Sequence, residues 1–231
     1  MPQLLIAFTI LLTVGAYLLT KSLYLKYRHP LLNIVLLGAG LIIATLVALH
    51  IPYSAYLPGR RIMTSLLGPA TVGLAVPLYR QRSLLRRYAP AIVAGVGIGS
   101  LASMLVAGLI ALAAGLPKEV LLSLLPKSVT IPFAVEVARI HGGSPGLASA
   151  FVVATGTLGS VFGGTLLTWA GIKDPVARGL AMGTGAHGQG TAMAFMEGER
   201  QGSMAGLAMT LAGLTTATIA PLVVRLLVRQ G

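Results

Sequence analysis

The sequence predicts an all-α membrane protein, a polytopic helical bundle with about seven or eight apolar segments, two or three of them broken or re-entrant. Only 10% of the 231 residues are charged and 55% are hydrophobic, whereas about a quarter of the residues in a soluble domain are charged. Windows without Lys, Arg, Asp or Glu recur along the chain, and a helix needs roughly 20 apolar residues to cross a bilayer. These windows lack the alternating polarity of a membrane β-barrel, so helices are the prediction.

Five segments have the length of ordinary membrane spans, and they cover residues 4–20, 31–49, 91–116, 147–171 and 203–228. The fourth span begins after Ser144-Pro145, a pair that suits a helix N-cap and first turn. The spacing of Gly159 and Gly163 lets helix backbones approach closely in lipid. Several helices are therefore expected to pack on one another as a bundle.

Three further apolar segments, residues 62–79, 120–137 and 176–196, contain proline or clustered glycine near the middle. Interrupted hydrophobic segments in corresponding positions are typical of transporter binding sites. Irregular backbone at membrane depth is tolerated only inside protein or beside a water-filled cavity. Residues 65–79 and 123–137 share a weak pattern that predicts a possible inverted repeat. The residues expected to break the helices or shape a site by their backbone are Pro69, Pro126, Pro132, Gly183, Gly185, Gly188 and Gly190.

The chain is expected to form a single integral membrane domain, residues 1–231, with N-terminal helices in residues 1–60 and a core in residues 61–231. Basic residues gather at 21–28 and 80–87, between apolar runs, as the positive-inside rule predicts for cytoplasmic loops. Arg225 and Arg229 suggest a cytoplasmic C-terminus as well. The net charge of +12 comes from 17 basic against 5 acidic side chains, and because the basic side chains lie between apolar runs, nucleic-acid binding is not expected.

Lys127 is the most informative residue, because it lies in the centre of an apolar segment between Pro126 and Pro132. A lysine in the middle of a membrane helix costs roughly 2.5–3.5 kcal/mol to insert. Beside Ser128 and Thr130 it predicts a broken helix and a cation that binds an anionic substrate. The alternative is a short surface helix or a lysine that snorkels to the interface.

His187 lies among glycines and polar side chains in a second interrupted segment. Each glycine costs about 1 kcal/mol relative to alanine in a helix, so irregular backbone near a ligand, or very close helix packing, is expected. Histidine titrates near neutral pH and could couple transport to protons, although a lone histidine is more often structural. The substrate-binding side chains predicted from the two segments are Lys127, Ser128, Thr130, Thr184, His187, Gln189 and Thr191.

Few residues in the chain suit catalysis or metal binding. Glu136 could pair with Lys127 or Arg139, or relay a proton together with His187. The chain has no cysteine, which excludes disulfides and thiolate chemistry. No Ser/His/Asp set, paired carboxylates or metal-ligand spacing stands out, so no catalytic residue, metal or cofactor is predicted.

Three motifs resemble the signature segments of the LrgB/CidB family of bacterial membrane proteins: LGPATVGLAVPLYRQ (67–81), LPKSVTIPFAVEVA (125–138) and ARGLAMGTGAHGQGTA (177–192). The resemblance implies a multi-pass protein of the inner (plasma) membrane that works with a small LrgA/CidA-like membrane partner. The family is described as holin/antiholin-like, modulating murein hydrolase export and cell lysis. Its plastid relatives carry glycolate and glycerate, and some bacterial pairs are linked to pyruvate uptake.

Two functions are therefore open at this point. The first is transport of a small monocarboxylate by alternating access, in which the one central lysine matches a substrate with one negative charge. The second is holin-like regulation of murein hydrolase export through oligomerisation, for which a buried Lys127 and His187 have no obvious use. A homodimer in the lipid bilayer is expected in either case.

Overall fold

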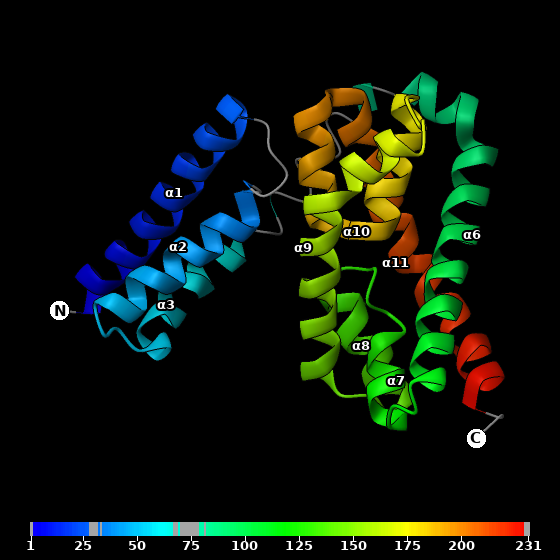
Figure 1. The fold of residues 1–231 in the computed structure, drawn as a ribbon, viewed down its shortest axis with the longest axis horizontal. Coiled ribbons are helices and arrows are strands. Elements are labelled where there is room, and N and C mark those ends of the chain that lie inside the picture. The colour runs from blue at the N-terminus through cyan, green and yellow to red at the C-terminus, as the bar shows by residue number, and fades with distance from the viewer. Residues whose placement is uncertain are drawn as a thin grey trace. The chain divides into compact units, whose positions relative to one another are not determined.

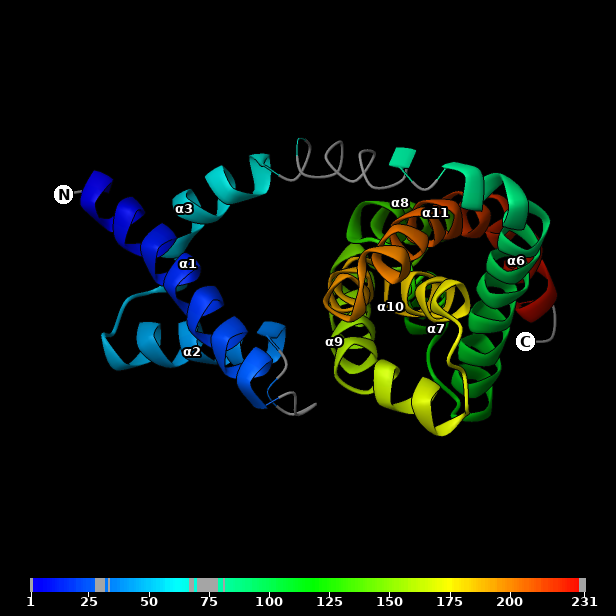
Figure 2. The ribbon, with the colours of Figure 1, turned by 90° about the horizontal axis from the view of Figure 1, so that it is seen from above.

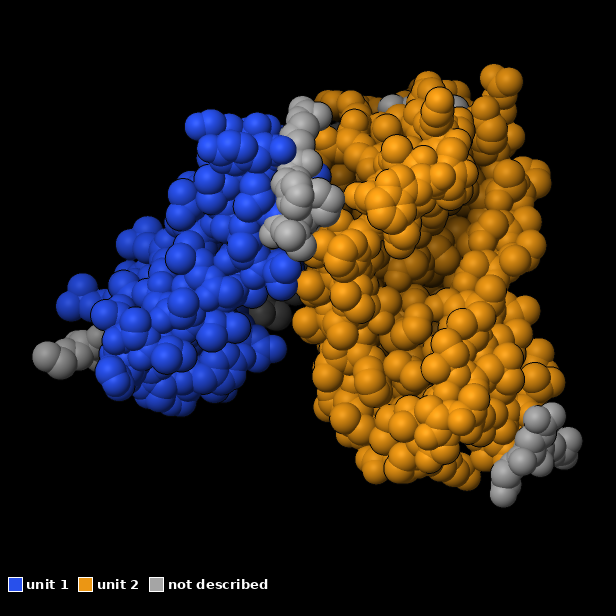
Figure 3. All heavy atoms as spheres, viewed as in Figure 1, with its two compact units in different colours: residues 1–76 blue, residues 77–231 orange. Residues whose placement is uncertain are grey.

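The computed structural model describes residues 2–27, 32, 34–66, 69, 79–80 and 82–228, and every regular element in these residues is a helix. The prediction of an all-α protein is confirmed. The chain divides into two compact units, Met1–Val76 and Pro77–Gly231 (Figure 3). That the two units act as one membrane domain stays a prediction.

The first unit contains α1 (Pro2–Tyr27), α2 (Ile34–Ala48) and α3 (Tyr53–Ser65). Both α2 and α3 pack on α1. A hydroxyl pair of 2.9 Å joins Thr13 of α1 to Tyr56 of α3, and Gly59 of α3 leaves room for the side chain of Thr9. The predicted spans at residues 4–20 and 31–49 correspond to α1 and α2. Most of the predicted interrupted segment 62–79, with the first half of the proposed repeat, lies outside the described residues; Pro69 is described as exposed.

The second unit is built on three long helices, α6 (Arg82–Ala113), α9 (Pro145–Trp169) and α11 (Glu199–Val228). Together with α1 they are the four helices among the described residues that are long and apolar enough to cross a membrane. α6 and α11 pack on each other along their length, through Met204, Ala208 and Ala212 near one end and Ala220, Val223 and Leu227 near the other. The three remaining predicted spans are confirmed as long helices.

Residues 120–137 form a broken segment, as predicted, because the chain leaves α7 (Lys118–Leu124) and enters α8 (Ile131–His141) through six non-helical residues. The end of α7 meets the residues that follow α8: the Ser144 backbone amide donates to Ser123 Oγ at 2.7 Å, and a β-carbon on Gly143 would lie 2.9 Å from the Ser123 backbone nitrogen. The chain therefore returns toward its starting point, and α7 and α8 form a re-entrant hairpin.

α10 (Pro175–Glu197) is a second re-entrant hairpin, because the helix breaks at His187, whose φ of 41° and ψ of −130° are not helical. Arg178 near its start pairs with Glu197 at its end, at 2.7 Å. These two residues are 19 positions apart, and a straight helix would separate them by about 28 Å. Gly190 packs directly on the Met182 carbonyl, so the two halves lie side by side.

The two hairpins enter the second unit from opposite ends (Figure 1). α10 packs against α6, α9 and α11 (Figure 2), while α7 and α8 pack against other stretches of the same three helices. α9 shows the division most simply: Val152 belongs to a cluster with Val129 and Ala134, whereas Gly159 and Gly163 face Ala186 and Met182 of α10. Residues 82–141 and residues 145–197 thus each form a long helix followed by a hairpin. The second copy runs in the opposite direction to the first, so the two form an inverted repeat.

This arrangement corrects one expectation about topology. α6 begins at one end of the second unit and, after three long helices, α11 finishes at the opposite end (Figure 1). As membrane-crossing helices, α6, α9 and α11 therefore place the start of α6 and the end of α11 on opposite sides of the membrane. The end where α6 begins carries more basic residues, namely Arg80, Arg82, Arg86, Arg87, Lys173 and Arg200. The positive-inside rule favours that end as the cytoplasmic one.

Cysteine labelling tests the α10 hairpin, because the chain has no cysteine of its own. Lys173→Cys and Arg200→Cys flank α10, and we expect an impermeant thiol reagent to label both from the same side of the membrane. Lys118→Cys, at the start of α7, should label from the other side. A straight α10 would instead place residues 173 and 200 on opposite sides, so labelling of those two from different sides would contradict the hairpin.

Candidate functional site

The tip of the α7–α8 hairpin carries Lys127. Pro126, which has no backbone donor to continue α7, is fully buried, and Pro132 occupies the first turn of α8. Between them the chain makes short turns, with the Lys127 amide donating to the Leu124 carbonyl at 3.1 Å. Thr130 is the extended residue before α8 and makes no side-chain cap. The two prolines therefore end one helix and start the next, and they leave Lys127 on irregular backbone.

The Lys127 ammonium group binds two hydroxyls. Its Nζ donates to Ser103 Oγ of α6 at 3.0 Å and to Ser128 Oγ at 3.1 Å, and the two hydroxyls lie 2.8 Å apart. Lys127 is partly buried, and its only partners in the described part of the chain are these neutral groups. The result is a cation inside an apolar bundle without a neutralising carboxylate. Such a group favours an anion as its ligand.

The tip of the α10 hairpin is held by His187. Its ring Nε2 lies 3.0 Å from the Val152 carbonyl of α9, and Thr191 Oγ1 donates to the His187 carbonyl at 2.8 Å. The ring fits because residue 156 of α9 is glycine: a β-carbon there would lie 2.5 Å from His187 Cε1. In this structure His187 therefore fastens the turn of the hairpin to α9.

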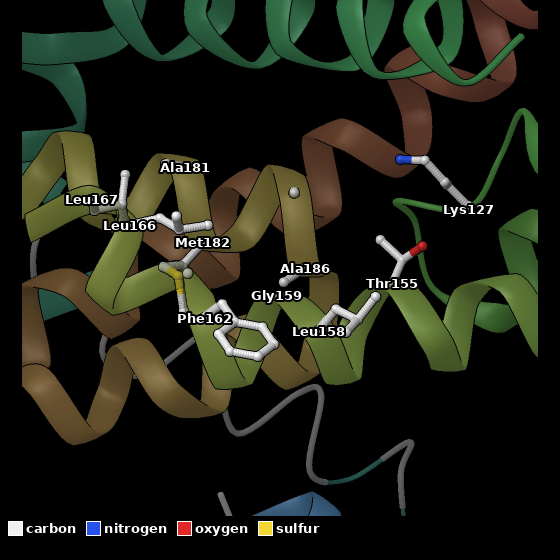
Figure 4. Close-up of a pocket in the computed structure, with 12 residues that line it drawn as sticks. Lys127, Thr155, Leu158, Gly159, Phe162, Leu166, Leu167, Ala181, Met182 and Ala186 are labelled. Carbon is white, nitrogen blue, oxygen red and sulfur yellow. The ribbon is translucent and has the colours of Figure 1, made fainter. Parts of the chain in front are cut away.

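A cavity of about 580 Å³ lies beside Lys127, between α9 and α10 (Figure 4). Lys127 and Thr155 stand at one end of it, and Figure 4 shows Leu166 and Leu167 at the other. Its wall is otherwise apolar, formed mainly by Leu158 and Phe162 of α9 and by Ala181, Met182 and Ala186 of α10. Among the residues that the structure describes, Lys127 is the one charged group in this lining.

A second cavity, of about 430 Å³, lies between α6 and the first half of α10. Ser103 and Thr184 supply its hydroxyls, and Ala181 and Gly185 line both cavities. The bond between Lys127 and Ser103 thus joins a residue of one cavity to a residue of the other. Figure 3 shows a hollow near mid-length on this face of the second unit.

The predicted site residues fall into those that line the cavities or the hydroxyl cluster, those that do not, and those with a local structural role. Lys127, Ser128, Thr184 and Gly185 belong to the hydroxyl cluster or to the cavity linings. The side chains of Thr130, His187, Gln189 and Thr191 line neither of these two cavities, so their role in binding stays a prediction.

The remaining predicted positions have local explanations. Glu136 forms an exposed ion pair with Arg139, at 2.6 Å. Gly183 and Gly190 of α10 serve close packing, because a β-carbon on either residue would meet another backbone. Gly188 has more room, with Met209 Sδ 3.8 Å from such a carbon.

Sequence reasoning missed Ser103 and Thr155. Both lie in long apolar helices, where a single hydroxyl usually bonds to its own helix and gives no signal of a site. Ser103 is 24 residues before Lys127, and no local pattern connects them. Ser100 and Ser103 are three residues apart on α6, and this helical spacing is the one signal that could have suggested a polar face on that helix.

Comparison with known proteins agrees with this description. The model of the LrgB-like family matches residues 13–226. The chain is 39% identical over 215 residues to the uncharacterized protein YxaC of Bacillus subtilis (strain 168), covering 93% of this chain and 94% of that protein. It is 32% identical over 217 residues to the holin-like protein CidB of Staphylococcus aureus (strain N315), covering 94% and 95%. An uncharacterized protein of Haemophilus influenzae is 34% identical over 227 residues, or 98% of each chain.

No solved structure matches the chain significantly. The family match extends from α1 to α11 and so includes both hairpins and the Lys127 cluster. The four long apolar helices and this match establish a membrane protein, and LrgB-like proteins are not a family of enzymes. This chain belongs to the LrgB-like family.

Proposed function

We propose that the protein carries a small monocarboxylate, the class that includes glycolate, glycerate and pyruvate, across the inner membrane by alternating access. The observation that supports this most is the Lys127 ammonium group at the tip of a re-entrant hairpin, whose partners among the described residues are all hydroxyls. Opposed broken helices in an inverted repeat are the usual frame of a transporter's binding site. A permanent hole would not need one unneutralised cation at such a place.

The Lys127 cluster matches a ligand with one negative charge. Lysine is a point charge on a flexible stem and binds an anion without the two-pronged geometry of arginine. Ser103 and Ser128, both already bonded to Nζ, can turn their hydroxyl protons toward a carboxylate. A substrate with two carboxylates would leave one charge without a partner, which is costly in an apolar cavity.

Alternating access fits the two cavities on either side of α10. The first half of α10 separates them, and Ala181 and Gly185 face both. A carboxylate bound at Lys127 could be reached from either cavity if the hairpin tips shift relative to α9. We propose the small LrgA/CidA-like membrane protein as the partner of this chain and a homodimer as its assembly.

A second function is favoured by the names of relatives, since the Staphylococcus proteins that match this chain are called holin-like. On that basis the chain would control murein hydrolase export and lysis through a membrane lesion. The two functions differ in what crosses the membrane: one small anion per cycle, or molecules of any kind through a hole.

Reconstitution of the purified protein into liposomes, with and without the partner, separates the two functions. We expect saturable uptake of at least one labelled monocarboxylate, while a large entrapped dye stays inside. Liposomes without protein give the baseline. Dye release together with non-saturable uptake would favour the holin-like function, and the absence of saturable uptake of any acid would contradict transport.

A further inference from the structure

The cavity beside Lys127 is charged at one end and apolar along the rest of its length. Its charged end has Lys127 and Thr155, and the rest of its lining is carbon and sulfur from side chains such as Leu158, Phe162 and Met182. Figure 4 shows Leu158 and Phe162 along α9, between Lys127 at one end and Leu166 and Leu167 at the other. A ligand that fills this space must be anionic at one end and apolar along its length.

The cavity is also long compared with an acid of two or three carbons. Thr155 and Leu167 both line it, and at 1.5 Å per residue they lie about 18 Å apart along α9. Its volume of about 580 Å³ falls within the range of roughly 300–1,000 Å³ that encloses drug-sized ligands. A short acid held at Lys127 would leave most of the apolar wall without a contact.

We infer that, within the proposed transport function, the site prefers monocarboxylates with an alkyl chain over the hydroxylated two- and three-carbon acids. The carboxylate lies at Lys127, Ser103 and Ser128, and the alkyl chain lies on the wall formed by Leu158, Phe162 and Met182. Of the described residues that line the cavity, Thr155 alone has a side-chain hydroxyl, so the hydroxyl groups of glycolate or glycerate would find few partners there. Burial of an unpaired hydroxyl is unfavourable, whereas each buried methylene is favourable.

The occupant we propose is a free acid rather than a lipid. Leu158 and Phe162 are 59% and 45% exposed, so the acyl chain of an anionic phospholipid could also reach this wall. Both ligands share an anionic head and an alkyl tail. They differ in that a free acid binds without any anionic lipid in the bilayer, and the experiment is arranged to use that difference.

The test measures dissociation constants for acetate, butyrate and hexanoate, and for glycolate and glycerate, on the purified protein in phosphatidylcholine nanodiscs. We expect the Kd to fall by about fourfold for each added methylene, with butyrate bound more tightly than glycerate. Lys127→Met protein in the same nanodiscs provides the correction for partition of the acids into lipid. No dependence on chain length, or glycerate bound as tightly as butyrate, would overturn the preference.

A matched pair of variants tests the location of the alkyl chain. Leu158→Asn places an amide on the cavity wall and should weaken hexanoate several-fold more than acetate. Val153→Asn makes the same kind of change on the same helix, at a residue that is 47% exposed and outside this lining, and should leave the ratio unchanged. Equal effects of the two variants would place the chain elsewhere.

Two further results separate this inference from the function on which it rests. If short acids bind at Lys127 but alkyl chains add nothing, the preference is wrong and the proposed transport function still holds. If no acid binds to the wild-type protein, both are wrong. Loss of hexanoate binding after phosphatidylglycerol is added would identify an anionic lipid as the occupant and contradict the free acid.

Discussion

Gly183→Ala is expected to destabilise the second unit by about 1–3 kcal/mol, the usual cost of overpacking a tight core. A β-carbon on residue 183 would lie 2.7 Å from Ala205 Cα and 2.8 Å from the Ala205 carbonyl carbon, in addition to its contact with the carbonyl oxygen. These are backbone atoms of α11, which cannot relieve the contact by a change of rotamer as a side chain can. The first half of α10 would have to move away from α11 as a whole.

Gly185→Ala is the matched control, two residues further along the same half-helix. Apart from the backbone of its own helix, no heavy atom of the described residues would lie within 4 Å of a β-carbon there. Alanine is the better helix former at both positions, by about 1 kcal/mol, so the difference between the variants isolates the contact with Ala205. Thermal melting followed by circular dichroism should show a lower Tm for Gly183→Ala and an unchanged or higher Tm for Gly185→Ala. Equal melting of the two proteins would contradict the close packing of α10 on α11.

The sequence predicted the elements of the second unit well because each leaves a local signal. Charge-free windows predict the long helices, and Pro126 with Pro132 predicts the break that carries Lys127. The clustered glycines of residues 183–190 were harder to interpret. The same residues suit irregular backbone or close packing. In the structure Gly183 and Gly190 pack on backbone, Gly185 does not, and the break lies at His187.

The direction of the hairpins could not be read from the sequence. A broken apolar segment has the same composition whether it crosses the membrane or returns. The deciding contacts join residues far apart in sequence, as Arg178 with Glu197 and Ser144 with Ser123. The basic residues alone placed both the loop before α6 and the C-terminal end in the cytoplasm, because they do not show which apolar segments cross the membrane and which return.

The candidate site was predicted in part. Lys127 and Ser128 were identified because a lysine between prolines in an apolar segment has few structural explanations. Ser103 and the apolar wall were missed, since they come from α6 and α9, which read as ordinary spans. His187 was singled out for its chemistry, and in the structure its ring bonds the Val152 carbonyl. The polar character of His187 thus indicated the position of the hairpin tip, while a role of His187 in substrate binding stays a prediction.

Lys127→Met is expected to lower monocarboxylate uptake by at least about tenfold. A hydrogen bond to a charged group contributes roughly 1.5–3 kcal/mol, and methionine keeps the length of the side chain without its charge. Folding should be little changed, because the variant removes a partly buried charge that has no counter-ion among the described residues. Lys118→Met is the control, since Lys118 is an exposed lysine at the start of the same hairpin.

Chemical restoration of the charge at residue 127 tests the anion site most directly, because the chain contains no other thiol. The measurement is uptake by Lys127→Cys protein before and after treatment with an aminoethyl methanethiosulfonate or with its neutral methyl analogue. A cation bound to the substrate at this position predicts little uptake by the unmodified variant, recovery with the amine and none with the methyl reagent. Wild-type uptake by the unmodified cysteine variant, or equal recovery with both reagents, would contradict a role for the Lys127 charge.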